Sequence, residues 1–170
     1  MFLFLMSTLT LVGAAQATPP HIVEHPDYKN AQDQLRKHGK AAFISSMVDL
    51  QREIEKNNGG NIDAYTNSAG VIGMPSSIHQ KVVYKIDGML IYLNKIRASK
   101  NQIPFDRERL LSEIRRGGSM YRDQVNLVCS TPGTRALIDG GVDYVYSFHD
   151  DHMTFIEKIK FDKHLCSMNE

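Results

Sequence analysis

The chain has 170 residues, with 20 lysines and arginines against 19 aspartates and glutamates, so its formal net charge is +1. A charge this close to zero predicts no general attraction to nucleic acid or to an anionic membrane surface. The length suits one domain with a sizeable hydrophobic core, and no apolar run beyond the N-terminal stretch could span a membrane.

The first 17 residues have the features of a signal peptide and contain no charged side chain. An apolar stretch is followed by Ala15-Gln16-Ala17, a small-residue pattern typical of a signal-peptidase site. That stretch is shorter than the roughly 20 residues that a spanning helix needs. We expect residues 1–17 to be removed during export to the periplasm or the medium, with a buried N-terminal helix as the alternative. No cysteine lies near the cut, so we expect no lipid anchor.

The chain contains two cysteines, Cys129 and Cys166, and we expect them to form a disulfide. An exported protein meets an oxidising compartment in which a disulfide persists, and two cysteines allow one intramolecular pairing. Closing a loop of this length would stabilise the fold by about 3–4 kcal/mol in the chain-entropy model. Two free thiols are the alternative, and the absence of a C-x-x-C pair disfavours a metal site built on them.

Residues 18–39 are expected to form a leader and a first helical segment, ahead of a single α+β domain at 40–170. Prolines near the start favour an extended leader, and Pro26 also suits the first turn of a helix. Apolar residues then recur at three- and four-residue spacing and predict a helix at Lys40–Lys56, which a run of asparagine and glycine ends. Gly39 can separate this helix from the preceding one.

The middle of the chain is predicted to contain a short strand at 64–73 and a turn at 74–77. The next residues, 78–86, can be interpreted in two ways. Their alternation and their β-branched and aromatic side chains favour a strand up to Gly88, with a helix at Met89–Ser99. The same apolar residues also fit one continuous helix across the glycine, and this alternative stays open.

Three short helices are predicted before the end of the chain. Each is preceded by a residue that can cap it through a side-chain oxygen, namely Asp106, Ser119 and Thr131. Pairs of glycines at 117–118 and 140–141 end the first and third of these helices.

The last part of the chain predicts a β-hairpin with strands at Val142–Phe148 and Met153–Phe161 and a turn at His149-Asp150-Asp151. Glu157 interrupts the apolar face of the second strand, which predicts a β-bulge near it, with a glutamate pointing into a cleft as the alternative. The expected fold is therefore α+β, with N-terminal helices and a small, mainly antiparallel sheet whose helices pack on one face. Its C-terminal hairpin would be stapled by the disulfide.

One sequence pattern resembles a group of small exported bacterial proteins that are largely uncharacterised. It consists of Cys129-x-x-Pro132, a short helix, Gly141-Val142-x-Tyr144-x-Tyr146-x-x-x-Asp150, a second strand and Cys166. This chain differs in having no glycine in the 149–152 turn and a longer middle section. The resemblance implies an α+β fold and an exported protein, and it implies no active residue.

Tyr144, Tyr146 and Phe148 share one face of the first hairpin strand. The simplest interpretation is that these aromatic side chains face the core. Any part of this row that is exposed would instead be a candidate partner surface, because contiguous apolar patches are rare on monomeric proteins.

The hairpin turn also offers metal-ligating side chains, His149, Asp151 and His152, with His164 as a possible fourth ligand. Imidazoles and carboxylates of this kind suit Zn²⁺ or Cu²⁺. Adjacent residues of an extended chain point to opposite sides, so not all of them can converge. A solvated polar turn is the alternative, since aspartate is favoured in turns.

Catalytic motifs are absent from the sequence. No serine lies in a G-x-S-x-G or S-x-x-K frame, although His79 is close to Ser77, and no glycine-rich segment has the lysine and helix context of a phosphate-binding loop. We therefore expect no enzymatic activity and no cofactor.

These observations favour a soluble exported binding or accessory protein that acts by contact with another protein, for example as an inhibitor or immunity protein. Two hypotheses from other classes remain. One is a small metal-binding protein that uses the His149–His152 turn, and the other is a hydrolase without a recognisable motif.

Overall fold

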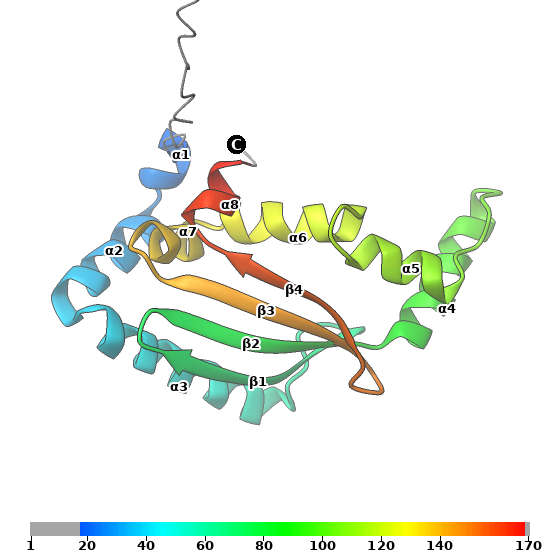
Figure 1. The fold of residues 1–170 in the computed structure, drawn as a ribbon, viewed down its shortest axis with the longest axis horizontal. Helices are drawn as coiled ribbons and strands as arrows, with labels where there is room; N and C mark the ends of the chain where they lie inside the picture. The colour runs from blue at the N-terminus through cyan, green and yellow to red at the C-terminus, as the bar shows by residue number, and fades with distance from the viewer. Residues whose placement is uncertain (1–17, 169–170) are drawn as a thin grey trace, which may run out of the picture.

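The computed structural model describes residues 18–168 and shows a four-stranded sheet with helices along both of its edges (Figure 1). The expected signal peptide lies outside the described residues. The strands are β1 (Thr66–Met74), β2 (Ser77–Tyr84), β3 (Asp143–Asp150) and β4 (Phe155–Phe161), in the spatial order β1-β2-β3-β4. The two outer pairs are antiparallel and the central pair, β2 and β3, is parallel.

The helices are α1 (Pro20–Val23), α2 (Pro26–His38), α3 (Lys40–Asn58), α4 (Ile86–Ser99), α5 (Arg107–Ile114), α6 (Ser119–Ser130), α7 (Pro132–Asp139) and α8 (Lys163–Ser167). Helix α3 packs mainly on β1, at one edge of the sheet, whereas α5, α6 and α8 contact β4 at the other edge. Helix α2 packs against α7 (Figure 1). Among residues 18–168, no helix has both the length and the apolar character needed to span a bilayer.

The core lies on one face of the sheet. Cross-strand register places Val71, Gln80 and Tyr146 side by side on that face. Gly73 lies on it too, and two side chains of α3 approach this glycine closely. Because successive residues of a strand point to opposite faces, the exposed Ile72 lies on the other face. The largest fully buried side chains include Phe148, Phe161, Ile86, Leu110, Ile138 and Ile159.

The predicted α+β class, the helix from residue 40 and the disulfide between Cys129 and Cys166 are confirmed. The disulfide joins α6 to α8, which follows β4 (Figure 1). Gly39 separates α2 from α3 as expected, with a φ of 77° that favours glycine. The prediction of a bulge is confirmed as well, because the register between β3 and β4 shifts next to Glu157.

The prediction of an extended leader was wrong, since residues 20–23 form the short helix α1. Pro20 occupies the first position of this helix, where its missing N–H group costs nothing. Ile22 is only 4% exposed, so burial of one apolar side chain accounts for the local order.

The two interpretations of residues 78–86 are now resolved. The continuous-helix alternative was wrong, because residues 77–84 pair with both β1 and β3. The predicted helix begins at Ile86 rather than at Met89, and Gly88 lies inside it. A Cβ at Gly88 would lie 3.4 Å from the ring of Tyr65, which is an ordinary contact distance.

Of the three predicted helix caps, the structure confirms Asp106, whose Oδ1 accepts a hydrogen bond from the Arg109 amide at 2.7 Å. The other two predicted side-chain caps were wrong. Ser119 is the first residue of α6 and its amide donates to Glu113 Oε2 at 2.8 Å. Thr131 occupies the N-cap position of α7 as expected, but its hydroxyl donates to the Leu127 carbonyl at 2.7 Å and makes no capping hydrogen bond.

The boundaries of the hairpin differ by two residues from those predicted. Strand β3 continues to Asp150, and β4 begins at Phe155 because Met153 has a φ of 63° and belongs to the turn. Asp150 is almost completely buried and closes this turn. Its Oδ1 accepts hydrogen bonds from the amides of His152 and Thr154 at 3.0 and 2.8 Å, and its Oδ2 accepts one from Arg107 at 2.7 Å.

Candidate functional site

A groove of about 890 Å³ opens over the central strands, on the same face of the sheet as the helices. Helix α6 forms one wall, the segment 62–66 and one residue of α3 form the other, and α4 closes one end. Figure 1 shows the reason for the opening: α3 and α6 lie at opposite edges of the sheet. The floor consists of side chains from β2 and β3, namely Gln80, Val82, Tyr84, Tyr146 and Phe148.

The aromatic side chains of the floor are packed against one another. The rings of Tyr84 and Phe148 are stacked with centroids 5.4 Å apart, and Tyr146 meets Phe148 edge-on at 6.1 Å. Burial raises the pKa of Tyr84 to about 12 and also raises the pKa of Tyr146, so both hydroxyls stay neutral at physiological pH. The floor is therefore a largely aromatic and apolar surface that also contains uncharged polar groups.

The walls expose large apolar side chains to solvent. Leu127 of α6 is 61% exposed, Ile62 of the opposite wall is 52% exposed and Tyr92 of α4 is 48% exposed. Tyr92 also contacts Tyr65, with ring centroids 5.3 Å apart. Exposed apolar side chains that surround a concave apolar surface are typical of an interaction site.

The charged residues among those that line the groove are both acidic. Asp63 lies on one wall and Asp123 lies on α6, while none of the described lining residues is a lysine, an arginine or a histidine. The groove therefore combines an apolar floor with negatively charged walls.

Both walls are tied to the rest of the fold. On α6, Cys129 follows the lining residues Leu127 and Val128 and is bonded to Cys166. On the other side, Ser68 of β1 donates a hydrogen bond to Glu55 of α3. These contacts tie α6 and α3, the two helices beside the groove, to the rest of the fold.

The three aromatic residues proposed as a partner surface occupy different environments. Tyr146 and Phe148 lie in the floor of the groove, and Phe148 is 2% exposed. Tyr144 does not line the groove; it is buried between its cross-strand neighbours Ile78 and Phe161. Only part of the predicted surface therefore faces the groove.

The proposed metal ligands do not converge. His149 and His152 lie at the β3–β4 turn, whereas His164 lies in α8, beyond the far end of β4 and about 20 Å away along the strand. Asp151 is exposed at the turn, and His149 Nδ1 lies 3.2 Å from the Met153 carbonyl. Nowhere in residues 18–168 do three such side chains form a group that could hold a metal ion.

The hydrolase hypothesis required a serine and a histidine within hydrogen-bonding reach, and one such pair exists. Ser77 Oγ lies 2.9 Å from His79 Nε2. Both residues lie on the sheet face opposite the groove, and within the described part of the chain no carboxylate forms an ion pair or hydrogen bond with His79. Among residues 18–168 the pair thus lacks the third group that orients a catalytic histidine.

Sequence reasoning missed the walls of the groove. One signal was available in the sequence: Leu127 is apolar but lies outside the stripe of α6 that contains the buried Val125 and Val128, which is unusual for a core residue. Ile62 and Tyr92 come from segments whose position beside β2 follows from the tertiary fold alone.

Neither family models nor the sequences of curated proteins match this chain. Two solved structures resemble it. One is a protein from Pseudomonas aeruginosa provisionally described as secreted, with 14% identity, a TM-score of 0.44 and coverage of 84% of this chain and 97% of that one. The other is the type II secretion system pilotin AspS from Vibrio cholerae, with 11% identity, a TM-score of 0.45 and coverage of 78% and 99%. At these values neither likeness bears on the function of the chain.

Proposed function

We propose that this chain is an exported binding protein whose groove captures an amphipathic helix of a partner protein. The observation that carries the proposal is the open groove of about 890 Å³ over β2 and β3, with its largely apolar floor and exposed apolar rim. The protein would act by binding rather than by catalysis. A partner that is itself an exported enzyme would make the chain an inhibitor or an immunity protein.

The position of the groove favours a helix as the occupant. Helix α3 packs mainly on β1 and α6 contacts β4, so the groove between them lies over the central strands β2 and β3. An amphipathic helix that lays its apolar face into an apolar groove is a recurring mode of recognition between proteins. Such a helix would complete the layer and remove the exposed apolar rim from water.

The charge of the groove indicates the chemistry of that helix. Asp63 and Asp123 lie on its two walls and no basic side chain lines it among the described residues. A partner helix with an apolar face flanked by lysine or arginine would be attracted, and one flanked by glutamate would be repelled.

Export is supported by two independent features. The N-terminal residues have the composition and the cleavage pattern of a signal peptide. The Cys129–Cys166 disulfide is of a kind that persists in oxidising compartments such as the periplasm or the medium.

The test uses two labelled peptides of about 18 residues, long enough to form roughly five helical turns. They share one leucine-rich face, and lysine or glutamate flanks it. We expect the lysine peptide to bind more tightly, and Asp123→Lys, which leaves the walls with one charge of each sign, to remove most of that preference. Fluorescence anisotropy measures both affinities.

Two matched variants locate the site. Leu127→Asn replaces an exposed apolar side chain of the rim with an uncharged polar one and should weaken binding of the lysine peptide about tenfold or more. Ile91→Asn is the control, because Ile91 is 75% exposed on α4 outside the groove. Absence of binding by either peptide, or equal losses in the two variants, would refute the proposal.

A further inference from the structure

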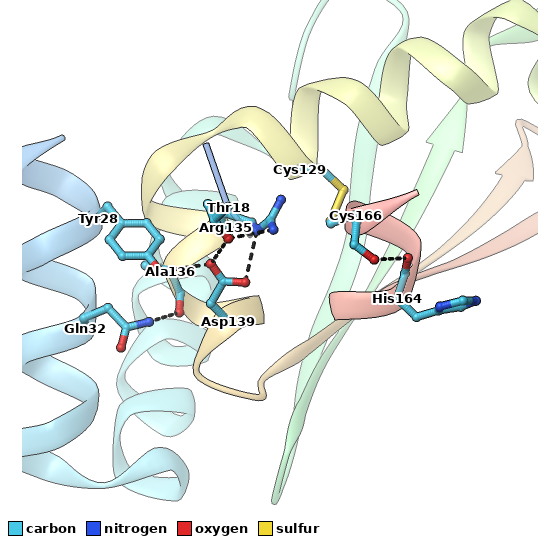
Figure 2. A network of polar contacts seen from close by, with 10 residues as sticks. Thr18, Tyr28, Gln32, Cys129, Arg135, Ala136, Asp139, His164 and Cys166 are labelled. Atoms are coloured by element: carbon cyan, nitrogen blue, oxygen red, sulfur yellow. Dashed lines mark hydrogen bonds and ion pairs between the residues drawn. A yellow bond between two sulfur atoms is a disulfide. The ribbon is translucent and has the colours of Figure 1, made fainter. Parts of the chain in front are cut away.

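A second built feature of the molecule lies at the other end of the fold from α4, where the N-terminal residues meet α7. The Thr18 hydroxyl donates a hydrogen bond to Asp139 Oδ2 at 2.7 Å and accepts one from Arg135 Nη2 at 2.7 Å (Figure 2). Tyr28 of α2 donates to the same carboxylate oxygen at 2.9 Å. Arg135 also pairs with Asp139 at 3.1 Å.

This network is largely removed from water. Arg135 is 2% exposed, and the side chain of Asp139 is 14% exposed. Burial and the hydrogen bond to Asp139 raise the pKa of Tyr28 to about 12, so its hydroxyl remains a donor. Loss of any hydrogen bond to this buried charged pair would lower the stability of the fold, because a buried donor or acceptor without its partner carries a desolvation penalty. The Thr18 hydroxyl is therefore held in place by its hydrogen bonds to Asp139 and Arg135.

The residues that follow Thr18 lie beside the disulfide. A cavity of about 290 Å³ is lined by Pro19, His21 and Ile22 and also by both cysteines, Cys129 and Cys166, together with Arg135. Ile22 is 4% exposed, Cys129 is 6% exposed and Cys166 is completely buried. Arg135 thus contacts the network on one side and the cavity beside the disulfide on the other (Figure 2).

We infer that Thr18–Val23 is a cap over the Cys129–Cys166 disulfide, and that thiol–disulfide exchange there requires release of Thr18 from Asp139 and Arg135. Exchange needs a thiolate to approach one of the two sulfurs, and with Cys129 6% exposed and Cys166 completely buried neither residue is open to such an approach in this structure. The cap lines the cavity beside both cysteines, so its release would widen the access to them. A dithiol reductant would attack only when the cap has opened.

The exchange itself follows ordinary dithiol chemistry. The attacking thiolate forms a mixed disulfide with one cysteine, and the other cysteine leaves as a thiolate that takes up a proton. The second thiol of the reductant then attacks the mixed disulfide, which frees the first cysteine and leaves the reductant oxidised to its own disulfide. The cap controls access to the first of these steps. Because the predicted signal-peptidase cut precedes Thr18, the residue that holds the cap would be the first of the mature chain.

The experiment measures the rate at which dithiothreitol reduces the exported, oxidised protein without urea, with the free thiols trapped and counted by mass spectrometry. Thr18→Val removes the hydroxyl at nearly constant shape and should accelerate reduction about tenfold. Thr18→Ser keeps the hydroxyl and should leave the rate close to that of the wild type.

A third variant separates local opening from global unfolding. Val71→Ala removes buried apolar volume in β1, away from the disulfide, and lowers the overall stability. We expect it to leave the reduction rate unchanged. Equal acceleration by Val71→Ala and Thr18→Val would show that exchange needs global unfolding and would overturn the inference, as would a Thr18→Val rate equal to that of the wild type.

Discussion

Replacement of both cysteines by alanine tests how much stability the disulfide supplies. The bond joins residues 37 positions apart. In the chain-entropy model a loop of this length removes about 13 cal/mol/K from the unfolded chain, which is about 4 kcal/mol at 25 °C. Alanine is preferred to serine because Cys129 and Cys166 are both buried, and a hydroxyl there would need a hydrogen-bond partner. For a domain of this size the loss corresponds to a fall in Tm of about 8–16 °C.

The assay is urea unfolding followed by circular dichroism at pH 7, applied to the oxidised wild type, the reduced wild type and the double alanine variant. We expect the last two to agree within about 1 kcal/mol, since both lack the covalent link. A Ser130→Ala variant is the control, because this exposed serine lies next to Cys129 and its loss should change little. If the double variant lost less than about 1 kcal/mol, the loop-entropy reasoning would fail for this fold.

Two other perturbations follow from the packing. Gly73→Ala would place a Cβ 3.0 Å from Ile44 Cγ2 and should lower the free energy of unfolding by about 1–3 kcal/mol, whereas Gly133→Ala meets no atom within 4 Å and should be neutral or stabilising; equal urea midpoints would contradict this. Burial acts to raise the pKa of Asp150, but hydrogen bonds from two amides and the charge of Arg107 outweigh it and hold that pKa below its usual range. Its stabilisation is therefore present above about pH 4 and is lost as the pH falls through the lower folded-state pKa. Asp150→Asn should cost about 2 kcal/mol at pH 7 and flatten the loss of stability in acid; parallel pH profiles of variant and wild type would refute this.

Much of the local structure could be predicted because it depends on neighbouring residues. Period-two alternation identified the β3–β4 hairpin, and an aspartate ahead of an apolar run identified the cap at Asp106. Prediction failed where a tertiary contact decides between local options. Burial of Ile22 stabilises helix α1. Ser119 is the first residue of α6 rather than its cap, and the Glu113 side chain accepts the hydrogen bond of the Ser119 amide.

The groove could not be predicted for the same reason. Its floor combines Val82 and Tyr84 with Tyr146 and Phe148, which belong to two distant segments. Local patterning showed that these residues share one face of their strands, and it could not show that α3 and α6 leave that face uncovered. Tyr144 has the same pattern as Tyr146 and is buried, so alternation alone does not distinguish core from floor.

The parallel pairing of β2 with β3 has a consequence for the order in which the groove forms. Residues 85–142 separate the two strands, so the second half of the floor leaves the ribosome long after the first. Until β3 is available, β2 has one unpaired edge and the floor is incomplete. The groove can therefore form only when most of the chain has been synthesised.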